Sequence, residues 1–123
     1  MLEPLYHIVN RAEWEQARAA GSYCPPSLAD EGFIHCSYPA QVLMPANTFY
    51  HGQANLVLLR IDPARVQAEV RHDPVEGSRA GVRSTEYFPH IYGPLNLDAV
   101  VGVLDFPPGA DGRFALPAEL AGE

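Results

Sequence analysis

Apolar residues fall in short runs along this chain, and most of these runs have the length of a β-strand. The clearest runs from Asn55 to Asp62 (NLVLLRID) and is apolar almost throughout. A strand that is apolar on both faces is typical of the centre of a sheet. The other predicted strands and extended segments are Leu5 to Val9, Gly32 to Ser37, Gln67 to His72, Tyr87 to Leu95, Ala99 to Phe106 and Phe114 to Leu116.

Two helices are expected in the first half of the chain. Asn10 has the side chain of a good helix cap, and Gly21 provides a plausible end for the helix that would follow it. Ser37 is placed to cap a second helix covering roughly residues 39–50. Pro45 should kink or shorten that helix, because proline lacks the backbone N–H that a helix interior requires.

The order of these elements predicts the fold class. Strand, helix, strand, helix and then mostly strands indicate an α+β fold with a small mixed or antiparallel sheet and two N-terminal helices. Loops are expected from Ser22 to Glu31, where two prolines stand together, and from Asp73 to Glu86, which is rich in Gly and Arg. No repeat or linker divides the 123 residues, so we expect a single domain spanning residues 1–123.

The composition narrows the classes of partner. The chain has 8 Lys+Arg against 15 Asp+Glu, a net charge of −7, which disfavours nucleic acid because phosphate binding needs a basic surface. Its 2 cysteines make no disulfide framework. We expect no signal peptide and no membrane span, and therefore a cytoplasmic protein.

Three predicted strands each place a histidine beside apolar, aromatic or hydroxyl-bearing side chains. The histidines are His7, His35 and His90, and strand alternation puts Ser37 on the face of His35 and Tyr92 on the face of His90. If the three faces converge, they form a concave site with polar groups on aromatic walls, which suits a small planar ligand. Histidine there could bind while neutral or act as an acid or base.

These residue types also have other common uses in proteins. A histidine in a strand is often simply half-buried and bonded to a backbone carbonyl. A metal site is disfavoured, because no spacing such as HExxH or CxxC is present and alternation turns Cys36 away from His35. Cys36 and Ser37 are poor candidates for a nucleophile, because there is no GxSxG motif and Ser37 is better explained as a helix cap.

Four segments resemble domain-of-unknown-function family 952, a family of bacterial and plant proteins. They are YHIV (6–9), GFIHCS (32–37), NLVLLRID (55–62) and FPHIYGPL (88–95). The likeness spans nearly the whole chain. It breaks between Arg71 and Tyr87, where His72-Asp73 stands in place of a Trp-Glu pair.

That family is similar in fold to the ADP-ribosyltransferase superfamily, which includes tRNA 2′-phosphotransferases and the enzyme that modifies rifampicin. The resemblance implies NAD as a candidate substrate, with His7 binding the nicotinamide ribose and His35 stacking on nicotinamide. It also implies an acid on a third strand, for which Asp73 and Glu86 are the nearby candidates. A carboxylate is expected because an oxocarbenium-like ribose needs negative charge beside it.

Three interpretations therefore stay open. The first is an NAD-binding, ADP-ribosyltransferase-like enzyme in which His7, His35 and His90 are catalytic and His7, His35, Ser37 and Tyr92 bind the cofactor. The second is a module that binds a nucleotide-like or other small molecule without turnover. The third is a domain that acts through protein contacts and uses its histidines for structure. Catalysis, substrate, acceptor and oligomeric state are not determined at this level.

Overall fold

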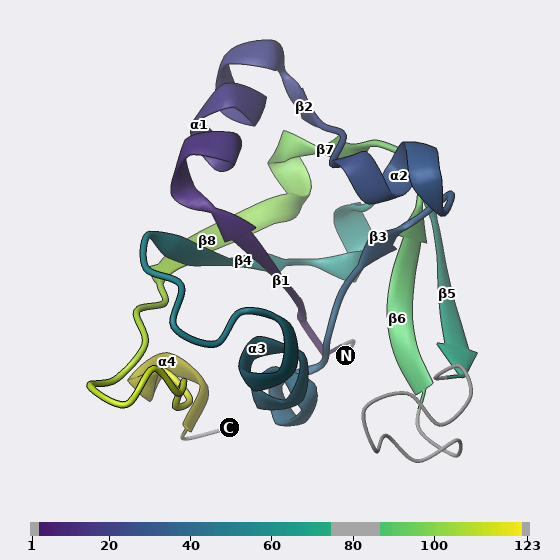
Figure 1. The fold of residues 1–123 in the computed structure, drawn as a ribbon. Coiled ribbons are helices and arrows are strands. Elements are labelled where there is room, and N and C mark those ends of the chain that lie inside the picture. Colours follow the sequence, from purple (N-terminus) through teal and green to yellow (C-terminus); the bar gives the residue numbers. More distant parts are fainter. Residues whose placement is uncertain (1–2, 75–86, 122–123) are drawn as a thin grey trace.

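The computed structural model describes residues 3–121 except 75–86, and this part of the chain has an α+β fold (Figure 1). The strands are β1 (Leu5–Asn10), β2 (Ser22–Tyr23), β3 (Ile34–His35), β4 (Leu56–Ile61), β5 (Glu69–Pro74), β6 (Tyr87–Tyr92), β7 (Leu95–Asn96) and β8 (Val100–Asp105). The helices are α1 (Arg11–Ala20), α2 (Pro26–Asp30), α3 (Leu43–Phe49) and α4 (Ala118–Ala121), with 3₁₀ turns η1 (Pro39–Gln41), η2 (Pro63–Arg65) and η4 (Leu97–Ala99).

The central sheet has the strand order β1-β4-β8, and both of its strand pairs are antiparallel. The middle strand, β4, is the run of apolar residues that the sequence placed at the centre of a sheet, so that prediction is confirmed. Val57, Leu58, Leu59 and Ile61 are completely buried. A strand can bury both faces only when other elements cover both sides of its sheet.

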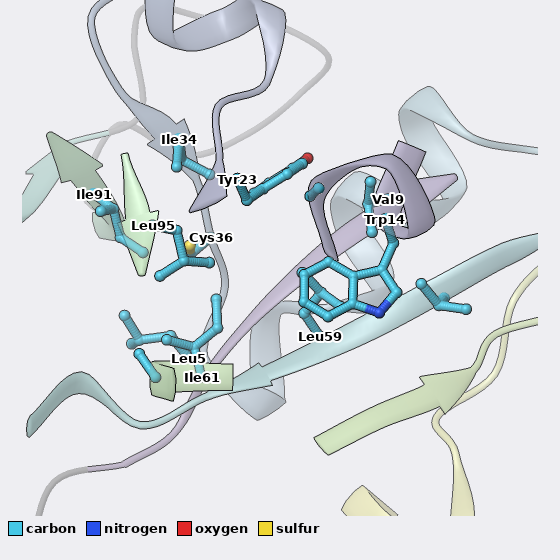
Figure 2. Packing of buried hydrophobic residues seen from close by; sticks show 13 residues of the cluster. Leu5, Val9, Trp14, Tyr23, Ile34, Cys36, Leu59, Ile61, Ile91 and Leu95 are labelled. Atoms are coloured by element: carbon cyan, nitrogen blue, oxygen red, sulfur yellow. The ribbon is translucent and has the colours of Figure 1, made fainter. Parts of the chain in front are cut away.

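Two hydrophobic clusters provide this cover. On one face of the central sheet, Leu5 and Leu59 pack with Trp14 of α1 and Tyr23 of β2 (Figure 2). On the other face, Tyr6 and Leu58 pack with residues of α3 and α4 and with Phe106 and Phe114. Neighbouring positions in β1 and β4 alternate between the clusters, as the alternation of strand side chains requires.

A second antiparallel sheet, β3-β6-β5, carries the residues of functional interest. Ile34 of β3 pairs with Ile91 of β6, and both are completely buried in the cluster that contains Trp14. His35 and His90 are the neighbouring cross-strand pair. Because alternate side chains leave opposite faces of a strand, burial of the two isoleucines turns both histidines away from the core.

The predicted helix at Asn10 is confirmed, whereas the predicted cap of the second helix is wrong. The Asn10 side chain accepts a hydrogen bond from the Ala12 N–H, and Gly21 ends α1 in the left-handed conformation. The second helical segment is divided into η1 and α3, and its first cap residue is Tyr38. Ser37 pairs its backbone with Tyr6 of β1 instead, which holds it in an extended conformation.

Proline explains two further departures from the expected elements. Pro45 is the third residue of α3, where its missing N–H has no intrahelical partner to lose, and α3 is shorter than the predicted 39–50 helix, as expected for a helix that contains this proline. Pro26 similarly opens α2 inside the segment 22–31, which was predicted to be a loop. The strand expected at 32–37 is reduced to β3, and residues 114–116 form no strand, although Phe114 is buried.

The predicted loop between Asp73 and Glu86 lies mostly outside the described residues, as does Glu86 itself. Among the helices of the described segments, none has the length and apolar character needed to cross a bilayer.

We predict that Ile91→Ala lowers the free energy of unfolding by about 2–5 kcal/mol, because it opens a cavity where β6 meets the core. Urea denaturation measures this change. The control is Val103→Ala, since Val103 is 44% exposed and its truncation should change stability by no more than about 0.5 kcal/mol. Similar losses in both variants would contradict the packing described above.

Candidate functional site

Aromatic and titratable side chains gather on the outward face of the β3-β6-β5 sheet. We call them the outer-face cluster, and it consists of Phe33, His35, Asp73, His90 and Tyr92. They come from three strands and from the residue before β3, and their common orientation follows from burial of Ile34 and Ile91 on the opposite face.

Phe33 lies at the centre of the aromatic contacts. Its ring stacks on the His90 imidazole with 4.1 Å between centroids and an interplanar angle of 14°. It also contacts His35 at 4.9 Å and Tyr92 at 5.2 Å. The His35 and His90 rings meet edge to face at 5.1 Å. Such stacked and tilted ring pairs are favourable and hold the side chains in defined orientations.

Asp73 joins this cluster through one carboxylate oxygen. Its Oδ2 accepts hydrogen bonds from Nδ1 of His90 at 2.7 Å and from the Tyr92 hydroxyl at 2.5 Å. The bond from Tyr92, together with His90, lowers the pKa of Asp73, so the carboxylate is charged at neutral pH. Sequence analysis named Asp73 only as a nearby candidate, because no sequence pattern showed that it faces His90.

His90 is held in one tautomer by this contact. Nδ1–H donates to Asp73, so Nε2 carries the lone pair of the neutral ring. Partial burial lowers the pKa of His90, and the bond to Asp73 opposes that effect. A neutral imidazole with an oriented lone pair beside a carboxylate is the arrangement of a general base.

His35 has a carboxylate partner of its own. Its Nε2 lies 2.6 Å from Oε1 of Glu31, and its side chain is 54% exposed. The outer-face cluster therefore contains two contacting imidazoles, each bonded to an acid. The His35 side chain is exposed, whereas that of His90 is only 12% exposed.

His7 lies apart from the outer-face cluster, buried in the core. Its Nδ1–H donates to the backbone carbonyl of His35 at 2.5 Å, and its Nε2 accepts from the Tyr23 hydroxyl at 2.7 Å. Burial lowers the pKa of His7 from 6.5 to about 4, so its ring is neutral at pH 7. The structure thus brings together His35, His90 and Tyr92, whereas His7 reaches β3 only through the backbone.

Ser37 also remains on the side of β1. It is 7% exposed, and its backbone N–H and C=O pair with Tyr6 at 2.8 and 2.7 Å. Its observed interactions are therefore those of a residue that joins β3 to the central sheet.

Sequence analysis missed two contributors to the outward face. Neither Phe33 nor Arg71 was among the site residues predicted from the sequence. The guanidinium carbon of Arg71 lies 4.4 Å from the centroid of the Tyr92 ring. Alternation along β5 was the available signal, since Glu69, Arg71 and Asp73 are two residues apart and share one face.

Two cavities lie away from the outer-face cluster. One, of about 190 Å³, is lined by Glu3, Leu5, Tyr38, Pro63, Val70 and His72. The other, of about 380 Å³, lies between α1 and the segment 22–26. Within residues 3–74 and 87–121, no group of three or more His, Cys, Asp or Glu side chains is arranged to hold a metal ion.

These features define a small α+β protein that carries a histidine–carboxylate cluster on one sheet. The model of the family described as "Protein of unknown function (DUF952)" matches residues 8–103, so the chain belongs to this family. The resemblance to family 952 noted from the sequence is thereby confirmed.

Solved structures of protein CC0527 from Caulobacter crescentus are similar to this chain. In the crystal structure, CC0527 is 38% identical over 96% of this chain and 98% of its own, with a TM-score of 0.78. In the solution NMR structure, CC0527 is 33% identical over 99% of this chain and 100% of its own, with a TM-score of 0.71. Among curated proteins, none matches this chain.

We predict that His7 makes stability depend on pH between about 4 and 6.5. The unfolded chain binds a proton at its normal pKa of 6.5, whereas the folded chain excludes it until about pH 4. Stability is therefore greatest above pH 6.5 and falls by about 3 kcal/mol on acidification to pH 4. Urea denaturation across this range measures the slope.

In the His7→Gln variant the slope should be clearly smaller, although His90 adds a contribution of the same sign. Val103→Ala provides the control, since it truncates an exposed side chain that does not titrate and should leave the slope unchanged. A His7→Gln slope equal to that of the unmodified protein would show that His7 is not held neutral by burial.

We predict that Asp73→Asn lowers the pKa of His90 further. The carboxylate favours the imidazolium, so its removal leaves burial without an opposing charge. The pH dependence of the His90 Hε1 NMR signal, compared between the variant and the unmodified protein, measures this shift. An unchanged or raised pKa would show that the bond to Asp73 does not persist in solution.

Proposed function

We propose that this chain is an NAD-binding enzyme of the ADP-ribosyltransferase type, with the outer-face cluster as its site. The observation that supports this most directly is the Asp73 carboxylate, which is bonded to His90 and Tyr92 beside the Phe33 ring. Transfer of ADP-ribose requires a carboxylate near the ribose and an aromatic surface for the leaving base, and the cluster contains both.

In this proposal, each member of the cluster has a defined part. Phe33 and His35 offer aromatic surface on which a nicotinamide or adenine ring stacks. Asp73 supplies negative charge to the oxocarbenium-like ribose as the base departs. Tyr92 and His90 hold that carboxylate in place, which lowers the cost of orienting it during the reaction.

The proposed reaction breaks the bond between C1′ of the ribose and the nicotinamide nitrogen. The bonding electrons go to that nitrogen, which neutralises the pyridinium ring and releases nicotinamide. The oxygen of an acceptor hydroxyl or of water forms the new bond to C1′. Its proton passes to the lone pair on Nε2 of His90, which is available because Nδ1–H points to Asp73.

His7 and Ser37 act in this proposal as positioning residues. His7 holds the carbonyl of His35, and Ser37 pairs with Tyr6, so both fix β3 against the central sheet. Neither needs to touch the reacting atoms to affect the position of His35.

We predict that NAD at millimolar concentration shifts the ring NMR signals of His35 and His90 and is slowly converted to nicotinamide. Asp73→Asn should reduce nicotinamide release about 100-fold, because an uncharged amide no longer stabilises the positive ribose. Chromatographic quantification of nicotinamide against remaining NAD gives the rate. Asp111→Asn is the matched control, since Asp111 only bonds the backbone of a distant turn and should leave the rate unchanged.

The two measurements separate the interpretations that the sequence left open. Shifts without release of nicotinamide would reject the enzyme and leave a binding module for nucleotide-like molecules. Unmoved histidine signals at millimolar NAD would reject both and leave a domain that acts through protein contacts.

A further inference from the structure

We propose that Arg71 binds the phosphates of the ligand and restricts the site to nucleotides that carry a diphosphate, excluding the corresponding nucleosides. This inference rests on the proposed function, since it assumes that a nucleotide occupies the outer-face cluster. It adds a specificity-determining residue that lies beside the reacting groups.

Strand pairing places Arg71 next to the cluster. Arg71 of β5 is the cross-strand partner of His90 in β6, and cross-strand partners share one face of a sheet. Its guanidinium lies over the Tyr92 ring, 4.4 Å from the centroid. This cation–π contact holds the guanidinium on the outward face of the sheet, the face that also carries Phe33 and His35.

The ion pair of Arg71 leaves it able to bind an anion. Nε lies 2.9 Å and Nη2 3.0 Å from the two carboxylate oxygens of Glu69, so the third nitrogen, Nη1, is not engaged by Glu69. The two side chains are 53% and 60% exposed. An ion pair this exposed to water contributes little, so a diphosphate with more charge can share or displace it.

The acidic charge of the chain makes the local position of Arg71 important for binding an anion. The chain has no lysine, so all 8 of its basic residues are arginines, and the net charge is −7. Overall attraction therefore does not bring an anion to this protein, and binding depends on local guanidinium geometry. In the described part of the chain, the other arginines lie on other elements or, for Arg113, in a loop; they are Arg11, Arg18, Arg60, Arg65 and Arg113.

The test compares three probes by NMR and calorimetry: NAD, ADP, and nicotinamide riboside, which has the same glycosidic bond without the diphosphate. We expect Arg71→Gln to weaken the binding of NAD and ADP about tenfold or more and to leave the affinity for nicotinamide riboside unchanged. The affinity of Arg71→Lys for NAD and ADP should lie between those of the unmodified protein and Arg71→Gln, because lysine keeps the charge and loses the bidentate geometry. The affinity of the unmodified protein for ADP should also fall as salt is added.

Arg18→Gln is the matched control. Arg18 is also exposed and bonded to a glutamate, Glu15 at 3.0 Å, but lies on α1. The Arg18→Gln variant should bind all three probes with the same affinity as the unmodified protein. Circular dichroism of each variant verifies folding, which a substitution at an exposed position should preserve.

The outcomes distinguish this inference from the proposed function. Unchanged affinity for NAD and ADP in Arg71→Gln would overturn the inference and leave the NAD proposal standing. Binding of ADP that depends on Arg71, without release of nicotinamide from NAD, would support the inference and reject the enzyme. Failure of the unmodified protein to bind ADP would overturn the role of Arg71 whatever the enzyme does.

Discussion

The arrangement of this protein depends on one buried imidazole that satisfies both of its hydrogen-bonding nitrogens. His7 donates to the carbonyl of His35 and accepts from the hydroxyl of Tyr23, so it joins β1 to β2 and β3. A buried ring in this position must be neutral, since the imidazolium would have no acceptor at the Tyr23 side unless the hydroxyl turned, and would lose its hydration. The partners thereby determine the tautomer as well as the position of the ring.

These hydrogen bonds matter for the position of β3, because β3 is only two residues long. So short a strand gains little from its own ladder. It is held from one side by β6, from another by the backbone pairing of Ser37 with Tyr6, and from the core by His7. These attachments place Ile34 in the hydrophobic core, and the side chain of His35 must then point outward.

The outward face of the second sheet carries titratable and aromatic side chains, whereas its inward face carries buried apolar ones. Ile34 and Ile91 are completely buried, while the cross-strand histidines beside them contact each other and two carboxylates. The hydrogen bond from Tyr92 lowers the pKa of Asp73 and keeps that carboxylate charged, and partial burial lowers the pKa of His90, which favours its neutral form near pH 7. A surface with stacked rings, an oriented base and a fixed carboxylate is suited to a planar ligand that develops positive charge, which is why we favour NAD.

The sequence by itself determined the class of fold, the central position of β4 and the first helix with both of its ends. These features depend on local patterns, namely an unbroken apolar run and a cap at each end of a helix. It also placed His90 and Tyr92 on one face of a strand, opposite Ile91, because alternation along a strand is a local property. Only the tertiary structure decided that His7 belongs to the core, that Asp73 meets His90, and that Phe33 lies between the rings. Those facts depend on how strands far apart in the chain are paired and on which face of each is covered, and strand pairing is set by packing of the whole chain.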